Sequence, residues 1–148
     1  MVVGNPPFGK IIKKPDLLKT YRNLYENKKT TNIFSFFIEK ALDLGEIVSL
    51  ITPKSLLSIP ELKKTRQLME SRLSEIIDYG ESAFDVKIET ISFITNLGKK
   101  KVKIISKILD KSFFLEENYL FDKKIPYWII YRNEFFDEVL EKMTLGVF

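Results

Sequence analysis

Val2-Val3-Gly4-Asn5-Pro6-Pro7-Phe8-Gly9 is the stretch that decides the fold of this chain. Its two adjacent prolines hold the backbone extended, because each fixes its own φ and biases the residue before it. An apolar strand end precedes the prolines, and an aromatic ring and a flexible glycine follow them. The stretch therefore presents an amide side chain, free carbonyls and a ring where a strand ends. That is the usual ligand-binding edge of an open α/β sheet.

These residue types suit a planar substrate that carries an amino group. The carboxamide oxygen of Asn5 and the carbonyl of Pro6 can both accept hydrogen bonds from an exocyclic NH2. Phe8 can stack on the ring that bears the amine. Such hydrogen bonds stabilise the positive charge that develops as the amine attacks a methyl donor. Orientation of the two reactants supplies most of the remaining effect.

In these residues the chain resembles the amino-methyltransferases, whose fourth motif is Asn/Asp/Ser-Pro-Pro-aromatic. It resembles most closely the N6-adenine DNA methyltransferases of the gamma arrangement, found in type II restriction–modification systems and in fused restriction–methylation enzymes. The resemblance extends to about residue 106. It covers the helix after the motif, a glycine–strand–proline passage, a passage with a second aromatic residue and the next strand, which are residues 32–44, 45–57, 76–84 and 90–95.

The resemblance implies a catalytic corner made of Asn5, Pro6, Pro7 and Phe8. Asn5 and Pro6 match the acceptors for the target amine, and Phe8 matches the aromatic residue that stacks on a flipped adenine. Phe84 matches the later aromatic residue that holds this base from its other side or edge, and the alternative for Phe84 is ordinary core packing. The base must leave the helix because its reacting nitrogen is buried in the duplex.

The resemblance also implies S-adenosylmethionine as the cofactor and double-stranded DNA as a partner. Gamma-type enzymes place the cofactor-binding half, with a glycine-containing motif, before the Asn-Pro-Pro-aromatic motif. The chain has six glycines, and none forms a Gly-x-Gly loop between a strand and a helix. We therefore expect the main cofactor-binding half to be missing from this chain and the isolated chain to be inactive. An uncovered apolar flank would then favour self-association.

The chain is weakly basic: it has 24 Lys and Arg against 20 Asp and Glu, a net charge of +4 and a pI near 9.1. Small groups of lysines can contact DNA phosphates, although such groups also occur as ordinary solvated surface. Two lysines are predicted to bind substrate. Lys10 follows the corner, and Lys54 follows an apolar strand at the same edge of the sheet.

The chain contains no cysteine and no histidine. Cysteine nucleophiles, disulfides, classical zinc sites and histidine bases are thereby excluded, and with them the zinc-dependent deaminases. The carboxylates show no metal-binding spacing. No secretory signal is visible, and the apolar runs fall short of a bilayer span, so we expect a cytoplasmic protein with no membrane partner.

The spacing of apolar residues predicts an α/β fold. The resemblance implies that this fold is an incomplete catalytic half of a Rossmann-like class I methyltransferase sheet, with a mixed α/β C-terminal extension. Residues 1–106 are expected to be the catalytic part, and residues 107–148 a connector and helix leading towards target recognition. Strands are expected at 2–3, 47–52, 76–79, 90–97 and 102–105, and helices at 16–28, 32–44, 58–73 and 134–143. Asp16 is expected to cap the first helix, and Ser58-Ile59-Pro60-Glu61 reads as a capping box for the third.

Three alternatives remain open at this point. The cluster of Tyr127, Trp128 and Tyr131 is either a base-stacking platform or an anchor in the core. The chain could also come from a protein-glutamine or RNA-guanine methyltransferase, although Gly80-Glu81-Ser82-Ala83-Phe84 favours DNA. Finally, it could be a non-catalytic piece that serves assembly or DNA binding.

Overall fold

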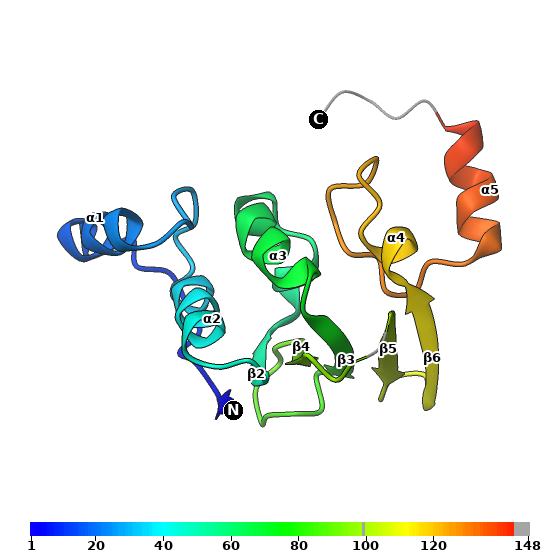
Figure 1. Ribbon diagram of the computed structural model, residues 1–148, viewed down its shortest axis with the longest axis horizontal. Coiled ribbons are helices and arrows are strands. Elements are labelled where there is room, and N and C mark those ends of the chain that lie inside the picture. The colour runs from blue at the N-terminus through cyan, green and yellow to red at the C-terminus, as the bar shows by residue number, and fades with distance from the viewer. Residues whose placement is uncertain (99, 144–148) are drawn as a thin grey trace.

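Six strands form one mixed sheet in the computed structural model, which describes residues 1–98 and 100–143 (Figure 1). The order across the sheet is β1-β2-β4-β3-β5-β6. The strands are β1 (Val2–Gly4), β2 (Val48–Pro53), β3 (Leu73–Gly80), β4 (Thr90–Thr95), β5 (Lys101–Ser106) and β6 (Lys111–Glu116). The predictions of an α/β fold and of its first five strands are confirmed, with ends shifted by a few residues.

The strand directions bring several connections to one edge of the sheet. β1 runs parallel to β2, and β3 runs parallel to β5. β4 is antiparallel to both β2 and β3, so β2 and β3 point the same way. The segments that follow β1, β2 and β3 therefore share an edge. They are the corner at residues 5–8, the turn that begins at Lys54 and the loop at residues 81–89.

Five α-helices and two short 3-10 helices complete the described chain. They are α1 (Pro15–Leu24), α2 (Ile33–Leu44), η1 (Lys54–Leu57), η2 (Pro60–Leu62), α3 (Lys63–Glu70), α4 (Glu117–Leu120) and α5 (Glu134–Lys142). Figure 1 shows α5 beyond β6, at the opposite end of the molecule from α1. Over the described residues, no helix combines the length and the apolar character that crossing a membrane requires.

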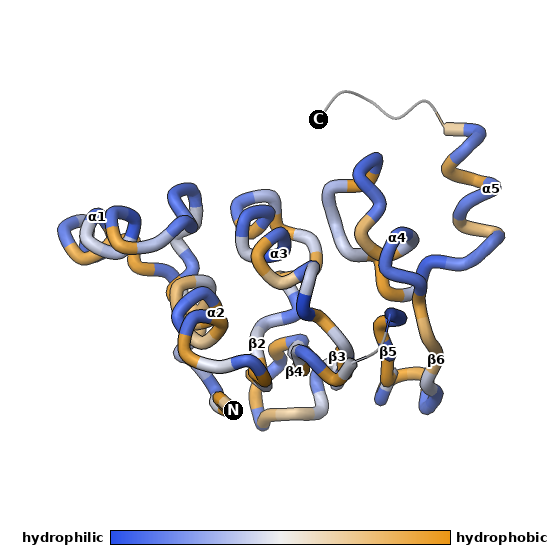
Figure 2. Tube along the Cα trace, viewed as in Figure 1, coloured by the Kyte–Doolittle hydropathy of each residue, from blue (hydrophilic) through white to orange (hydrophobic). Residues whose placement is uncertain are grey.

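One continuous apolar core joins α2, α3 and the C-terminal segment to the sheet. Val48 and Leu50 on β2 are buried, while Ser49 between them is half-buried. β5 alternates in the same way, with Val102 and Ile104 buried. This period of two means that one face of these strands meets the core. Figure 2 shows apolar residues gathered along the strands and on α2, whereas apolar and polar residues alternate along α5. α5 buries none of its residues.

The first helix differs from its prediction at both ends. It begins at Pro15, with Lys14 at the N-cap position, so Asp16 lies in the first turn and does not cap it. A carboxylate there still favours the positive end of the helix dipole. The helix ends at Leu24 instead of residue 28, because the next backbone N–H groups take a tertiary partner. Those of Glu26 and Asn27 donate to the carboxylate of Glu39 at 2.6 and 3.2 Å.

The expected capping box at residues 58–61 is wrong. Ser58 makes no side-chain cap, Pro60–Leu62 form the short η2, and α3 begins only at Lys63. The carboxylate of Glu61 reaches across to the segment before α2, where it accepts hydrogen bonds from the backbone N–H of Thr31 and the amide of Asn32. A long-range contact has replaced the local one that the sequence pattern favours.

The C-terminal region is also more regular than expected. The supposed connector at residues 107–125 contains β6, which extends the sheet by pairing with β5, and α4. A domain boundary near residue 106 stays a prediction, although the sheet itself continues to Glu116. The predicted helix at residues 134–143 is confirmed as α5, and the side chain of Asn133 caps it by accepting from the Phe136 N–H at 2.8 Å. Residues 144–148 of the expected extension lie outside the described chain.

Candidate functional site

The corner at residues 5–8 leaves β1 at the shared edge of the sheet, as predicted from its position after a strand. Pro6 is buried, Phe8 is half-buried, and Asn5 and Pro7 are exposed. The amide of Asn5 and the carbonyl of Pro6 have no hydrogen-bond partner among the described residues. The two predicted acceptors are therefore free to bind a ligand.

Phe84 approaches the corner from a distant part of the sequence. β3 ends at Gly80, whose φ of +56° and close contact with Ile108 leave no room for a side chain. The loop that follows carries Phe84 back over the sheet edge. Its ring meets the ring of Phe8 edge to face, with centroids 6.1 Å apart and planes at 81°. Phe84 is 36% exposed, so its ring is not a core side chain.

Phe8 and Phe84 border one cavity of about 430 Å³. The structure brings together all four corner residues and Phe84, and it adds three residues that the sequence did not single out, Asp85, Val86 and Ile88. Val86 and Ile88 are largely exposed apolar side chains in the same loop. In the sequence they alternate with Asp85 and Lys87 directly after Phe84, and this alternation was the signal that could have identified them. This arrangement can hold a flat ring beside two unpaired acceptors.

The two predicted substrate lysines lie outside this cavity. Lys10 follows the corner with a half-exposed side chain, and its Nζ lies 4.0 Å from Glu61. Lys54 stands at the end of β2, where its Nζ pairs with Asp78 at 2.8 Å and with Glu89 at 3.3 Å. Because two carboxylates balance the charge of Lys54, Lys10 is the better placed of the two to contact a phosphate.

Lys54 belongs to a buried polar network that the sequence did not reveal. Asp78 on β3 has a fully buried side chain that accepts hydrogen bonds from the Tyr131 hydroxyl at 2.5 Å and the Gly80 N–H at 3.0 Å. Burial alone would raise the pKa of Asp78, but Lys54, Tyr131 and Gly80 together lower it. The pKa of Lys54 is raised: burial opposes the shift, and Asp78 outweighs it. The pKa of Tyr131 is raised by burial and by Asp78.

Of the two alternatives for the aromatic cluster near the C-terminus, the anchor in the core holds for Trp128, and Tyr131 packs partly buried against that core. Trp128 is 5% exposed, its ring packs against that of Phe121 with centroids 5.4 Å apart, and its backbone N–H donates to the carbonyl of Leu57. The hydroxyl of Tyr131 donates a hydrogen bond to the carboxylate of Asp78. Tyr127 faces the guanidinium of Arg66 at 5.8 Å. These contacts fasten residues 127–131 to the sheet and to α3.

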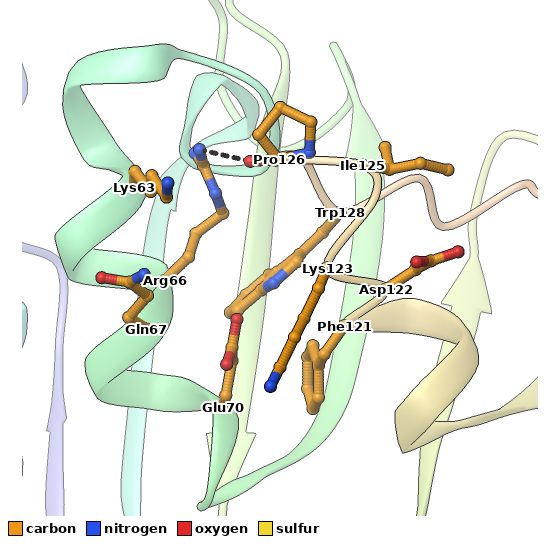
Figure 3. Close-up of a pocket in the computed structure, with 10 residues that line it drawn as sticks. All are labelled: Lys63, Arg66, Gln67, Glu70, Phe121, Asp122, Lys123, Ile125, Pro126 and Trp128. Carbon is orange, nitrogen blue, oxygen red and sulfur yellow. Dashed lines mark hydrogen bonds between the residues drawn. The ribbon is translucent and has the colours of Figure 1, made fainter.

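A second cavity, of about 280 Å³, lies between α3 and the C-terminal segment (Figure 3). Figure 3 shows Arg66 of α3 reaching the carbonyl of Pro126, a hydrogen bond of 3.0 Å. Arg66 is 2% exposed and also donates to the carbonyls of Leu56 and Ile59. This cavity shares no lining residue with the Phe8–Phe84 cavity, and the buried arginine beside it acts as a tether.

A known protein family covers the first part of the chain. Residues 1–84, more than half of the chain, match the family described as Eco57I restriction-modification methylase. The chain therefore belongs to the Eco57I restriction-modification methylase family. No curated protein sequence matches it.

Solved structures of restriction–modification proteins share the fold. The type IIG restriction endonuclease BpuSI is 17% identical with a TM-score of 0.53, over 70% of this chain and 14% of that chain. A type I restriction–modification complex is 15% identical with a TM-score of 0.54, over 71% and 23%. The DrdV–DNA complex is 16% identical with a TM-score of 0.51, over 80% and 18%. At these identities the likeness concerns the fold alone, and the chain spans less than a quarter of each.

Proposed function

We propose that this chain is the catalytic part of a site-specific DNA adenine-N6 methyltransferase of the gamma arrangement, acting in a restriction–modification system. The methyl donor would be S-adenosylmethionine and the acceptor a flipped adenine. The observation that carries the proposal is the edge-to-face contact of Phe8 and Phe84 beside the unpaired acceptors of the corner. Membership of a methylase family supports methyl transfer. Likeness in fold to the DrdV–DNA complex supports DNA as the partner.

The cavity would hold the flipped base by its faces and edge. Its volume of about 430 Å³ falls within the range of small-molecule sites. Phe8 would stack on the base, and Phe84, at 81° to Phe8, would close it from the edge. Ring contacts of this kind contribute about 1–3 kcal/mol per base and tolerate any sequence around it. They would offset the cost of removing the base from the duplex.

The corner would align the amine of the base. The oxygen of Asn5 and the carbonyl of Pro6 would each accept one N–H of the exocyclic amine, and both are free to do so. Two acceptors hold the amine in one orientation and stabilise positive charge on its nitrogen. No group with a specially tuned pKa is needed at the corner, because alignment supplies most of the effect.

The described residues do not fit the whole donor. S-adenosylmethionine would supply an electrophilic methyl group, but no glycine-rich turn from strand to helix lies beside the corner in residues 1–98 and 100–143. The two glycines nearest in sequence, Gly4 and Gly9, flank the corner itself. We therefore propose that another part of the enzyme forms the main donor site, completing a Rossmann-like class I sheet.

The architecture suggests where that other part would meet this chain. Within residues 1–98 and 100–143, β1 pairs with β2 and has no strand on its other side, and Val3 on it is 66% exposed. An exposed apolar edge strand invites pairing. We propose that this edge receives the cofactor-binding half in the enzyme and causes self-association when that half is absent. Residues 107–148 would lead towards target recognition.

Product analysis tests the proposed function. The complete enzyme that contains this chain would be incubated with unmethylated DNA and S-adenosylmethionine labelled in its methyl group, and the DNA digested to nucleosides. The expected label is in N6-methyl-2′-deoxyadenosine. Label in methyldeoxycytidine would contradict the adenine assignment. In parallel incubations with release factor or RNA in place of DNA, label in protein glutamine or RNA guanine with none in DNA would contradict DNA as the substrate.

A further inference from the structure

We infer that Glu61 is a positioning residue for the corner at residues 5–8, acting through the segment at residues 31–33. Its effect on reaction rate rests on the proposed function, whereas its effect on the geometry of the corner does not. Glu61 touches neither the cavity nor the rings of Phe8 and Phe84. It stands in η2, beyond β2 in the sequence, and it holds the backbone to which the corner is attached.

Backbone pairing holds the chain on both sides of the corner. On one side, β1 pairs with β2, and Gly4 lies opposite Leu50. On the other side, Lys10 forms an antiparallel bridge with Asn32. The Ile11 N–H donates to the carbonyl of Thr31 at 2.9 Å, and the Ile33 N–H donates to the carbonyl of Gly9 at 3.1 Å. The direction of the corner therefore depends on both pairings.

Because of Gly9, the direction of the corner depends strongly on the pairing of residues 9–11 with residues 31–33. Gly9 has a φ of +117°, and nothing lies within 4 Å of the position where a side chain would begin. Glycine is free to change conformation in that region. Since no side chain restricts the backbone of Gly9, the orientation of Phe8 depends on how firmly residues 9–11 are held, by their hydrogen bonds to residues 31–33 and by the buried side chain of Ile11.

Glu61 holds residues 31–33 with its carboxylate. One oxygen accepts from the backbone N–H of Thr31 at 3.2 Å and from its hydroxyl at 3.3 Å. The other oxygen accepts from the side-chain amide of Asn32. Asn32 is 6% exposed, so its amide has little access to water as a substitute partner. Charge-assisted hydrogen bonds of this kind are stronger than neutral ones.

The contact is specific to this segment and is not a helix cap. Asn32 occupies the N-cap position of α2, yet its side chain makes no cap and donates to Glu61 instead. Lys10, beside the corner, also places its Nζ 4.0 Å from the same carboxylate. Glu61 thus meets both strands of the small pairing that follows the corner.

Glu61→Gln tests the inference in the complete enzyme. The glutamine lacks the negative charge and one of the two acceptor oxygens of Glu61, so its hydrogen bonds to Thr31 and Asn32 are weaker, the pairing loosens and the amine is less well aligned. A small misplacement of the reacting amine lowers the rate of the chemical step by about 10- to 100-fold. We expect the single-turnover rate to fall by about that factor, while the dissociation constants for DNA and donor stay close to those of the unchanged enzyme. Glu70→Gln, the same chemical change on α3 beside the other cavity, is the matched control.

A rescue variant separates positioning from general loss of structure. In Glu61→Gln/Asn32→Asp, the new glutamine amide can donate to the new aspartate while its oxygen still accepts from Thr31. We expect this double variant to recover much of the lost rate. Hydrogen exchange measured by mass spectrometry should show faster exchange for residues 9–11 and 31–33 in Glu61→Gln, a return towards normal in the double variant and no change in β3.

Each outcome decides the inference. Faster local exchange, a slower rate and recovery in the double variant would support it. A normal rate with normal exchange in Glu61→Gln would overturn it, and so would exchange that rises throughout the molecule without recovery. If the unchanged enzyme transfers no methyl group to DNA, the proposed function fails, and the exchange experiment alone decides whether Glu61 holds the corner.

Discussion

The rings of Phe8 and Phe84 lie edge to face, with centroids 6.1 Å apart, although 76 positions separate them in the sequence. The first ring follows β1 and the second sits in the loop after β3, at the edge where the parallel strands end. Aromatic pairs in this geometry gain about 0.5–1.5 kcal/mol beyond their buried area. A partly exposed pair beside unpaired acceptors is better suited to holding a third ring than to closing a core.

Loss of the second ring should weaken the hold on an extruded base. In the complete enzyme, Phe84→Ala should reduce the fluorescence increase of 2-aminopurine placed at the target position, because one wall of the cavity is missing. Phe37→Ala is the control, since it removes another half-exposed ring from α2, away from the cavity. Equal fluorescence in Phe84→Ala and in the unchanged enzyme would make Phe84 a structural residue only.

The buried network around Asp78 should stabilise the fold in a pH-dependent way. Asp78→Asn removes the charge that faces Lys54 and should lower the free energy of unfolding at pH 7 by about 3 kcal/mol. The folded-state pKa of Asp78 lies below its ordinary value of 3.8, so its contribution is complete above that pH and is lost as the pH falls through the folded-state value. Urea unfolding should therefore show the two proteins converging at acidic pH. A difference that stays constant down to the lowest pH would rule out this source of stability.

The tether at Arg66 can be followed through the only tryptophan in the chain. Arg66→Met leaves the carbonyls of Leu56, Ile59 and Pro126 without their donor, each at a cost of about 1–3 kcal/mol where burial is complete. The segment around Trp128 should loosen, and the emission of Trp128 should shift to longer wavelength. Lys64→Met, an exposed change on the same helix, should leave the emission unchanged. An unshifted spectrum in Arg66→Met would show that other contacts suffice to hold the segment.

Binding of S-adenosylmethionine tests the proposal that the main donor site lies in another part of the enzyme. Isothermal titration of the 148-residue chain with S-adenosylmethionine should show no measurable heat of binding, because no glycine-rich loop stands beside the corner in the described residues. Binding at micromolar concentration would refute the proposal that the main donor site lies elsewhere. Sedimentation of the same sample should show self-association that disappears when the cofactor-binding half is added.

The features that were predicted correctly from the sequence are those determined by residues close together in the chain. The two prolines and the strand before them placed the corner at the sheet edge, and the apolar run at residues 47–52 predicted the buried strand found as β2. The helical spacing from Ile33 likewise predicted α2. In each case one local pattern admitted few alternatives, and tertiary contacts agreed with it.

Long-range polar contacts account for most of what the sequence did not reveal. Glu61 fits a capping box locally, but Thr31 and Asn32 offer it more donors across the fold. Asp78 reads as one polar residue in a strand, and only the folded chain brings Lys54 and Tyr131 to it. β6 was missed because its segment, Lys111–Glu116, has little alternation and becomes a strand by pairing with β5.

The most direct test of the central claim is the single-turnover rate of methyl transfer by Asn5→Ala in the complete enzyme. Asn23→Ala, which removes an exposed amide from α1, is the control. We expect Asn5→Ala to slow transfer by about 100-fold or more, with the affinities for DNA and donor preserved. Transfer at the normal rate, or a loss explained entirely by weaker DNA binding, would contradict the claim that this corner aligns the reacting amine.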